Sequence, residues 1–409
     1  MPVSHALTHP TTPDDDLVGL AEVAALHVLF SQVADPRKPR GIRHQVATVL
    51  TVTLLAALAG ARNFREAGDR AADLPQSLLA AAGTRRDRSS GALTAPSGST
   101  LRRVIEELDG DACDLLACQW LADRARRLAG LTAVQGEGEG ESEPWFGVAI
   151  DGKTVRNSGA GCIEENVKLF SAMLHGQALV IAQVRVPDGT TEVTRVQALL
   201  DPLDLDGAMV TADAAHTQQA TAAYLAESKK CDYTLTVKGN QPTLLAQVQA
   251  ALADAKRANV AACELERGHG RIVTRQIWIA PARGVEFPHA AQVFRIRRDV
   301  RDVAGRRISK EIVHGVTSAP ALRASPAQIA RAVRGHWGIE NKIHWVRDVL
   351  FHEDHQHTYL GSAAQLMAML RNLAIGLLRL AGHTEIKRAT EHIAADRLRI
   401  LPLLAASRS

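Results

Sequence analysis

Two short apolar runs that each end in an aspartate constrain the fold of this chain more than any other feature. The first, 145–150, is bounded by Pro144 and runs into Asp151-Gly152-Lys153, and the second, 208–212, runs into Asp213. Short apolar runs bounded by turn residues are typical of buried strands. Because ligands collect at the carboxyl ends of strands in open α/β sheets, we expect both acids to face a cleft. The alternative for Asp151 is that Asp-Gly simply begins a turn.

The chain changes character on either side of residues 135–143. This stretch alternates Gly and Glu, which neither pack nor hold a regular element, and therefore predicts a linker over 135–144. Before it, after a loose tail over 1–20, apolar residues at helical spacing predict an all-α N-terminal domain over 21–134. Its helices are expected over 20–30, 46–58 and 101–128.

After the linker the pattern is that of an α/β domain, predicted over 145–380. Two strands, 168–175 and 178–186, flank Gly176-Gln177, and helical stretches 192–200 and 217–228 alternate with strands that end at 212 and 237. A β-rich insertion with basic residues is predicted over 243–320. A capping box at Ser325-Pro326 with Gln328 then begins a helix. Residues 381–409 are predicted to form a helical tail.

Composition narrows the class of protein but does not decide it. Apolar content of 46% with 22% charged residues is ordinary for a globular protein. A formal net charge of +4 is too small to identify a nucleic-acid partner, although basic residues cluster at 85–88, at 295–307 and on the helix over 101–128. Such clusters suit phosphate recognition, and solvated surface patches explain them equally well.

The cysteines and the apolar segments point to the cytoplasm. The five cysteines are odd in number and show no Cys-x-x-Cys spacing, which argues against a disulfide framework or a cysteine zinc site. The most apolar segment, 46–60, falls short of the roughly 20 residues that span a bilayer and is predicted to be a buried helix. The N-terminus does not have the pattern of a signal peptide.

A third acid, Glu340, lies in a segment dense in His, Trp and Arg. Ile339, Ile343, Val346 and Leu350 follow helical spacing and are expected to face the core. A separate polar stripe is predicted at i, i+4, i+8 and i+11, formed by His336, Glu340, His344 and Arg347, with Trp337 beside it. Glu340 would bind metal while its neighbours hold phosphate. The alternative is an exposed ladder of salt bridges.

Three carboxylates from distant parts of the chain are what two-metal phosphoryl transfer requires. Acidic oxygens hold a pair of Mg²⁺ ions about 4 Å apart, and magnesium prefers such hard ligands. Competing sites fit less well. His352, His355 and His357 lack the His-Glu-x-x-His spacing of a zinc helix, and the sequence has no Walker loop and no Gly-x-Ser-x-Gly elbow.

Four ordered motifs, at 149–156, 212–218, 237–241 and 336–341, resemble those of the ISAs family of insertion-sequence transposases. The stretches at 35–37, 41–44 and 269–271 are similar to the same family. The resemblance covers roughly residues 25–380. It implies DDE catalysis on a ribonuclease-H-like fold, preceded by the family's associated N-terminal domain.

Carried over by position, the resemblance implies Asp151, Asp213 and Glu340 as catalytic, metal-binding acids, with two Mg²⁺ ions per site and Mn²⁺ as a substitute. Candidates for holding DNA or orienting the acids are Lys153, Arg156, Lys238, Asn240, Arg271, His336, Trp337, Asn341, Lys342, His344 and Arg347. Three places depart from the pattern. Val273 stands where an acid is expected, Arg347 where an apolar residue is usual, and His or Gln after Asp354 where a base is usual.

The resemblance thus implies a DNA transposase that binds terminal inverted repeats and catalyses metal-dependent cleavage and strand transfer. It would work in the cytoplasm, associated with the nucleoid when bound to DNA, as a homodimer on paired ends, without a membrane or a nucleotide cofactor. Two alternatives stay open. One is a catalytically inactive DNA-binding descendant, and the other is a nuclease that cuts without joining.

Overall fold

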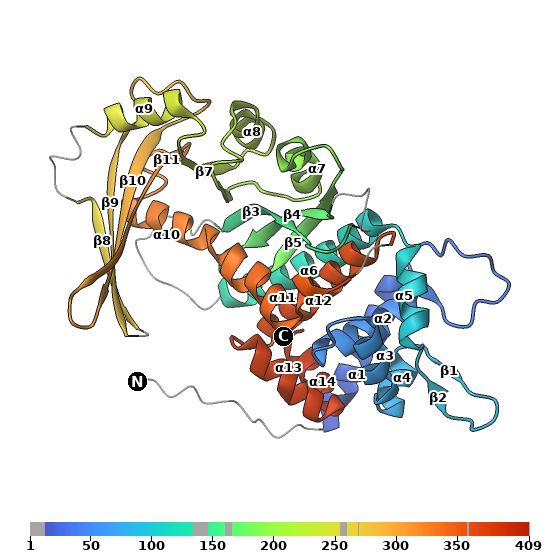
Figure 1. The fold of residues 1–409 in the computed structure, drawn as a ribbon. Coiled ribbons are helices and arrows are strands. Elements are labelled where there is room, and N and C mark those ends of the chain that lie inside the picture. The colour runs from blue at the N-terminus through green and yellow to red at the C-terminus, as the bar shows by residue number, and fades with distance from the viewer. Residues whose placement is uncertain are drawn as a thin grey trace. The chain divides into compact units, whose positions relative to one another are not determined.

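The computed structural model describes residues 13–133, 146–159, 166–253, 260–268, 270–357 and 360–408. The chain divides into two compact units that interleave along the sequence (Figure 1). The first comprises Met1–Gly136, Thr154–Val167 and Ile343–Ser409, and the second comprises Glu137–Lys153 and Lys168–Lys342. The predicted linker, 135–144, lies outside the described residues, and the predicted domain limits remain predictions.

A mixed sheet forms the second unit. Among the described residues, nine strands join it in the order β5-β4-β3-β6-β7-β11-β10-β9-β8. Their bounds are β3 Gly147–Thr154, β4 Lys168–Leu174, β5 Val180–Val186, β6 Met209–Ala212, β7 Asp232–Val237, β8 Ala262–Gly268, β9 Arg271–Pro281, β10 Gln292–Asp302 and β11 Arg307–Thr317. The pairs β3–β6 and β6–β7 are parallel, and the pairs from β7 to β8 are antiparallel. The predicted α/β sheet is therefore confirmed.

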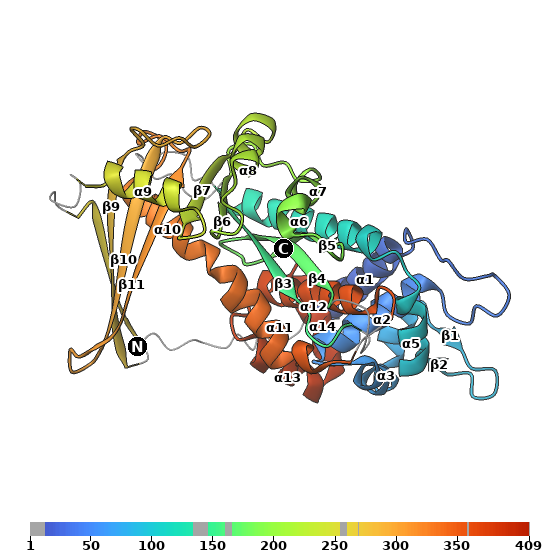
Figure 2. The same cartoon turned by 45° about the horizontal axis from the view of Figure 1, so that its top comes forward.

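The predicted β-rich insertion is part of this sheet and not a separate layer. The last residues of β11, His314 to Thr317, pair with Val237 to Thr234 of β7. From there, β8–β11 run side by side as a long ribbon that extends beyond the other strands (Figure 2). Almost all residues of β8 are exposed, so this strand has no buried apolar face that the sequence pattern could reveal.

Short helices cover the sheet. They are α7 Val196–Leu200, α8 Gln219–Ala223, α9 Pro242–Ala251 and α10 Pro326–His336, with a 3₁₀ turn, η1 Glu192–Arg195, and π-helical turns, η2 Tyr224–Ser228 and η3 Ile339–His344. The predicted capping box of α10 is present, with Ser325 and Gln328 each bonded to the other's backbone. One face of α10 places Ile329 and Val333 in a core with Phe294 and Ile296 of β10.

The first unit is mostly helical. Its helices are α1 Pro13–Phe30, α2 Val46–Leu58, α3 Phe64–Ala72, α4 Gln76–Ala81, α5 Gly98–Glu106, α6 Gly110–Ala133, α11 Trp345–Leu350, α12 Ala363–Leu380, α13 Ile386–Ala395 and α14 Ile400–Ala406, with 3₁₀ turns η4 Glu353–His355 and η5 Arg397–Arg399. It is not all-α, because β1 Arg85–Arg86 pairs with β2 Leu93–Thr94. The expected single helix over 101–128 is two helices, and α1 begins at Pro13, inside the tail predicted as loose.

Two apolar helices form the core of this unit. Every residue of α2 is buried, as predicted, and α2 packs against α12. Among the described helices, α12 is the one long and apolar enough to cross a membrane by length and composition, and 89% of that stretch is buried inside the protein. Helix α14, which is part of the predicted tail, packs against α1. The backbone of Leu401 lies so close to Gly19 that it leaves no room for a side chain there.

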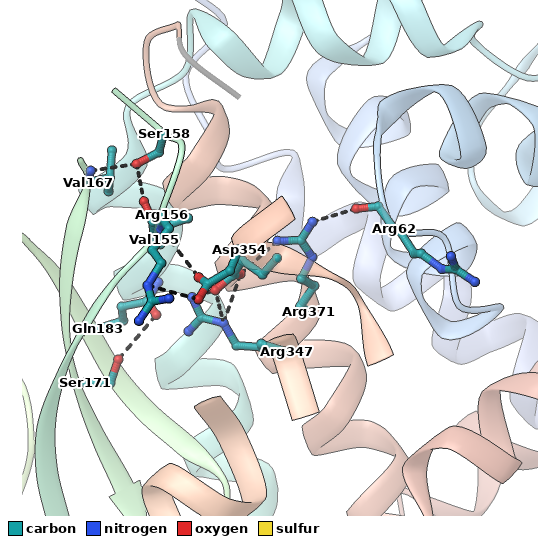
Figure 3. Close-up of polar contacts among 11 residues, drawn as sticks. Arg62, Val155, Arg156, Ser158, Val167, Ser171, Gln183, Arg347, Asp354 and Arg371 are labelled. Carbon is teal, nitrogen blue, oxygen red and sulfur yellow. Dashed lines mark hydrogen bonds and ion pairs between the residues drawn. The ribbon is translucent and has the colours of Figure 1, made fainter. Parts of the chain in front are cut away.

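A buried charge cluster ties together the helices that follow residue 343 (Figure 3). Arg347 donates to both carboxylate oxygens of Glu353, at 2.7 to 3.0 Å, and Arg371 donates to Glu353 at 2.8 Å. Arg371 also donates to the Arg62 carbonyl at 2.6 Å. The side chains of Arg347, Glu353 and Arg371 are at most 3% exposed, so the carboxylate compensates two buried cations.

We predict that Glu353→Gln lowers the free energy of unfolding by about 3–5 kcal/mol, because it removes the carboxylate charge to which both buried guanidinium groups are bonded. Denaturant unfolding measures this loss. The matched control is Glu266→Gln, which removes an exposed partner of Arg275 and should cost less than about 1 kcal/mol. Equal effects of the two substitutions would contradict the structural role of Glu353.

Candidate active site

Strand register brings the first two acids together. In the parallel pair β3–β6, Ile150 lies opposite Ala212. Asp151 is the next residue of β3, and Asp213 directly follows β6, so the two acids lie on neighbouring strands at the carboxyl end of β6. This is the edge where open α/β sheets place their ligand sites.

The charges around Asp151 show that further acids lie in the same region of the second unit. Burial, followed by the negative charges of Asp213 and Glu340 and, to a smaller extent, Glu192, raises the pKa of Asp151 to about 7. A hydrogen bond from the Gly152 N–H opposes this rise in pKa. All these residues belong to the second unit. Without a cation, the acids repel one another.

The turn that carries Asp213 is held by hydrogen bonds to its backbone. The Ala215 N–H donates to the Asp213 carboxylate at 2.9 Å. The Thr217 hydroxyl lies 3.1 Å from the Asp213 carbonyl and 2.6 Å from that of Thr236 on β7. Asn240, which follows β7, donates its side-chain amide to the Ala214 carbonyl at 2.7 Å. Asn240 therefore supports the Asp213 turn from the neighbouring strand.

Glu340 lies on the π-helical turn η3, and this turn breaks the predicted polar stripe. A π turn is wider than an α turn, so residues four apart no longer share one face. Glu340, Asn341 and Lys342 are exposed, whereas His336 and His344 are buried. The prediction of one continuous polar face was wrong. Ile339 and Ile343 face the core as predicted.

A buried network fixes the end of α10 against the sheet. The Thr211 hydroxyl of β6 lies 2.9 Å from His175 Nε2 and 3.4 Å from His336 Nδ1. Burial lowers the pKa of His175 to about 3 and that of His336 to about 4, so both rings are neutral at pH 7. Any Cβ on Gly147 or Gly335 would lie within 2.3 Å of His175 Nδ1, so these glycines make room for the ring.

Sequence reasoning missed Glu192 and His216. A Cβ on Gly152, beside Asp151, would lie 2.0 Å from the Glu192 carboxylate. Glu192 also lies 3.9 Å from His216, whose buried ring stacks on Phe170 at 4.8 Å. Glu192 thus touches the segments that carry both aspartates. It stands at the start of a helical stretch, where an acid is ordinary, so the sequence held no signal for it.

The structure places the remaining predicted residues in both units. In the second unit, Lys153 is 9% exposed on β3, Lys238 is exposed after β7, and Arg271 is exposed on β9. Trp337 lies under the Arg298 guanidinium, 5.9 Å from the ring centre. The positive charges of Lys238 and Lys342 reach the buried rings of His336 and His175, respectively.

Three predicted residues belong to the first unit. Arg156 is exposed and lies 3.5 Å from Asp354 (Figure 3). His344 is buried, and Arg347 is fully buried against Glu353. Arg347 is thus matched by an anion at the position where the family pattern has an apolar residue. The DNA-contact roles of all the predicted residues remain predictions.

The acids suit a hard divalent cation. Among the residues that the structure describes, no group of three or more His, Cys, Asp or Glu side chains is arranged to hold a metal ion as it stands. Mg²⁺ uses one or two carboxylates and keeps several waters, so it does not need three acids in one shell. After burial, the charges of Asp213 and Glu340 contribute most to the raised pKa of Asp151, and a cation among these acids would offset their repulsion. The oxygen donors fit Mg²⁺ or Mn²⁺.

Comparison with known proteins identifies the family. Residues 147–377 match the model described as Transposase DDE domain, and residues 28–121 match the one described as DDE_Tnp_1-associated. "Putative transposase YncI" of Escherichia coli O157:H7 is 27% identical over 86% of each chain. "H repeat-associated putative transposase YhhI" of E. coli K12 is 24% identical over 94% of this chain and 99% of that one.

A solved piggyBac transposase synaptic complex with hairpin DNA aligns with a TM-score of 0.38, at 11% identity over 94% of this chain and 76% of that one. The family assignment depends on the model matches, the first of which spans more than half of the chain. The large mixed sheet with helices is compatible with the ribonuclease-H-like fold expected of such a domain. The chain belongs to the family of insertion-sequence DDE transposases.

Proposed function

We propose that the chain binds the ends of its own insertion sequence, cleaves them in a metal-dependent reaction and joins them to target DNA. The observation that carries this proposal is the register that sets Asp151 beside Asp213, with the charge of Glu340 reaching Asp151. Two copies of the chain would pair as a homodimer on cytoplasmic DNA, with one copy for each element end. Membership of the DDE transposase family supports the reaction class.

In this proposal Asp151, Asp213 and Glu340 hold the divalent ions. When bound, such ions polarise the scissile phosphate, lower the pKa of attacking water and stabilise the leaving oxygen. The protein's own contribution is to position the acids. Thr217 and Asn240 hold the Asp213 turn, and the buried Thr211–His336 contact fixes the helix end that leads to Glu340. Exposed Lys238 and Lys342 would attract DNA phosphates.

The proposed acids predict a loss of cleavage without a loss of folding. Asp151→Asn, Asp213→Asn or Glu340→Gln should each reduce cleavage by about a thousandfold or more, because a divalent ion supplies several kcal/mol and each 1.4 kcal/mol is tenfold. The assay is nicking and joining of supercoiled DNA that carries the element ends, in Mg²⁺ or Mn²⁺. Asp201→Asn, outside the acid group, is the control. Cuts that depend on the three acids but yield no joined products would indicate a nuclease. Metal binding without cut or joined DNA would indicate an inactive descendant.

The metal-free protein should become less stable as pH rises. Asp151 ionises near 3.8 when unfolded and near 7 when folded, so between these values the unfolded state binds fewer protons and stability falls as pH rises. The penalty, of the order of a few kcal/mol, is complete above pH 7. Asp151→Asn should therefore stabilise the metal-free protein at pH 8 but not at pH 3.5. Thermal unfolding with and without Mg²⁺ tests this, and Mg²⁺ should stabilise wild type more than Asp151→Asn.

Glu192 should support metal binding through its contact with Gly152. A Cβ at Gly152 would displace the Glu192 carboxylate, which is a movable side-chain end. Gly152→Ala and Glu192→Ala should therefore each weaken Mg²⁺ affinity severalfold, and the double variant should be no weaker than either single one. Calorimetry of Mn²⁺ or Mg²⁺ binding measures this. Strictly additive losses would show that the two residues act independently.

A further inference from the structure

The ribbon formed by β8–β11 has two faces of opposite electrical character. Directly paired residues of antiparallel strands point to the same side of a sheet, and successive residues alternate. The register of the strands therefore assigns each side chain to a face. Arg295, Arg297, Asp299 and Arg301 of β10 lie on one face, and Ile296, Arg298 and Val300 lie on the other.

The first face is strongly positive, and we call it the basic face. It carries six cations and one anion. The cations are Arg267, Arg295, Arg297, Arg301, Arg307 and Lys310, and the anion is Asp299. Asp299 is bonded to Arg297 at 2.6 Å and lies 3.8 Å from Arg307. The Arg295 guanidinium lies over the ring of its cross-strand partner Trp278, at 4.9 Å.

The opposite face is nearly neutral and paired within itself, and we call it the paired face. Its cations are Arg271, Arg275 and Arg298, and its anions are Glu264, Glu266, Asp302 and Glu311. Arg275 contacts Glu264 and Glu266, and Arg298 contacts Glu311. Helix α10 packs on this side, where Arg334 pairs with Glu264 and Ile329 joins Ile296 in the core.

Most of the basic face is open to solvent. Helix α9 packs on β10 and β11, near the end of the ribbon that joins β7, and the strands continue well past it (Figures 1 and 2). Arg267, Arg301, Arg307 and Lys310 lie on the strand segments beyond α9 and are exposed. Leu265 and Ile312, on the same face, are 57% and 40% exposed. The charges are thus not used to hold the ribbon to the sheet.

We propose that the basic face binds the phosphate backbone of duplex DNA. Alternate residues on a strand recur about every 6.8 Å, and neighbouring strands lie about 4.8 Å apart, so the cations form a two-dimensional array and not a line. Such an array matches the dense negative charge of a duplex and releases counterions on contact. Each guanidinium group can bind a phosphate through two parallel hydrogen bonds, and a duplex presents such phosphates at close, regular spacing.

This inference deepens the proposed function by giving the substrate a second, non-catalytic contact. It involves a different set of residues from those implied by family resemblance, of which Arg271 alone lies on the ribbon, on its paired face. Contacts of this kind position DNA without reading its sequence. The basic face should therefore contribute to affinity for any duplex and should set its salt dependence.

The test compares two variants that each remove two positive charges, one from the basic face and one from the side of the ribbon on which α10 packs. The basic-face variant is Arg301→Gln/Lys310→Gln, and the paired-face control is Arg275→Gln/Arg334→Gln. Both are made in the full chain carrying Asp151→Asn, and binding to a duplex without element ends is measured across salt concentrations. The basic-face variant should lower affinity about tenfold or more and reduce the log–log salt slope by about 1.8, because each phosphate contact contributes about 0.9. The control should leave both nearly unchanged.

Asp299→Asn adds a test of opposite sign, because removal of the single anion should tighten binding. Equal losses of DNA affinity in the two double variants would show that only net charge matters, and would overturn the proposal. Unchanged DNA affinity in the basic-face variant would also overturn it. Competition by poly-glutamate as effective as that by DNA at equal charge would reassign the face to acidic polypeptides. If the three acids still control cleavage while the basic face has no effect on binding, this inference fails and the proposed function stands.

Discussion

The parallel pairing of β3 with β6 is the constraint on which the site depends. Its register ends with Ile150 opposite Ala212, so the two aspartates that follow cannot avoid one another. Burial, together with the negative charges of Asp213 and Glu340, raises the pKa of Asp151 to about 7. Because the fold holds these carboxylates close together, it favours cation binding: a divalent ion offsets the electrostatic repulsion between them.

Buried polar contacts maintain this geometry. Thr211 lies between the rings of His175 and His336, and so couples β6 to the end of the helix that leads to Glu340. Burial keeps both histidines neutral, so His336, which the charge of Asp213 reaches, adds no positive charge that would compete with a metal ion. In the other unit, Glu353 similarly holds two helices together through its ion pairs with Arg347 and Arg371. In each case the central polar group, Thr211 or Glu353, contacts more than one partner and therefore favours one arrangement.

Patterns of apolar residues predicted the strands before Asp151 and Asp213, the buried helix α2 and the capped start of α10, because these features depend on local burial and local hydrogen bonds. The failures have a common cause. The π turn at Glu340 follows a sequence that continues the helical spacing, and β8 is exposed and has no buried apolar face to mark it. The position of Glu192 beside Gly152 and the ion pair of Arg347 with Glu353 depend on which segments come into contact in the fold. The different charges of the two ribbon faces become visible only once the strand register is known.

The most direct test of the central claim is to locate the metal without relying on activity. Fe²⁺ substituted for Mg²⁺ generates hydroxyl radicals that cut the backbone beside the bound ion, and mass spectrometry maps the cuts. The account predicts cuts clustered near Asp151, Asp213 and Glu340, which Mg²⁺ suppresses in competition. Cuts confined to the His352–His357 stretch, or absent from any one of the three acids, would contradict the assignment of that acid and the site built on it.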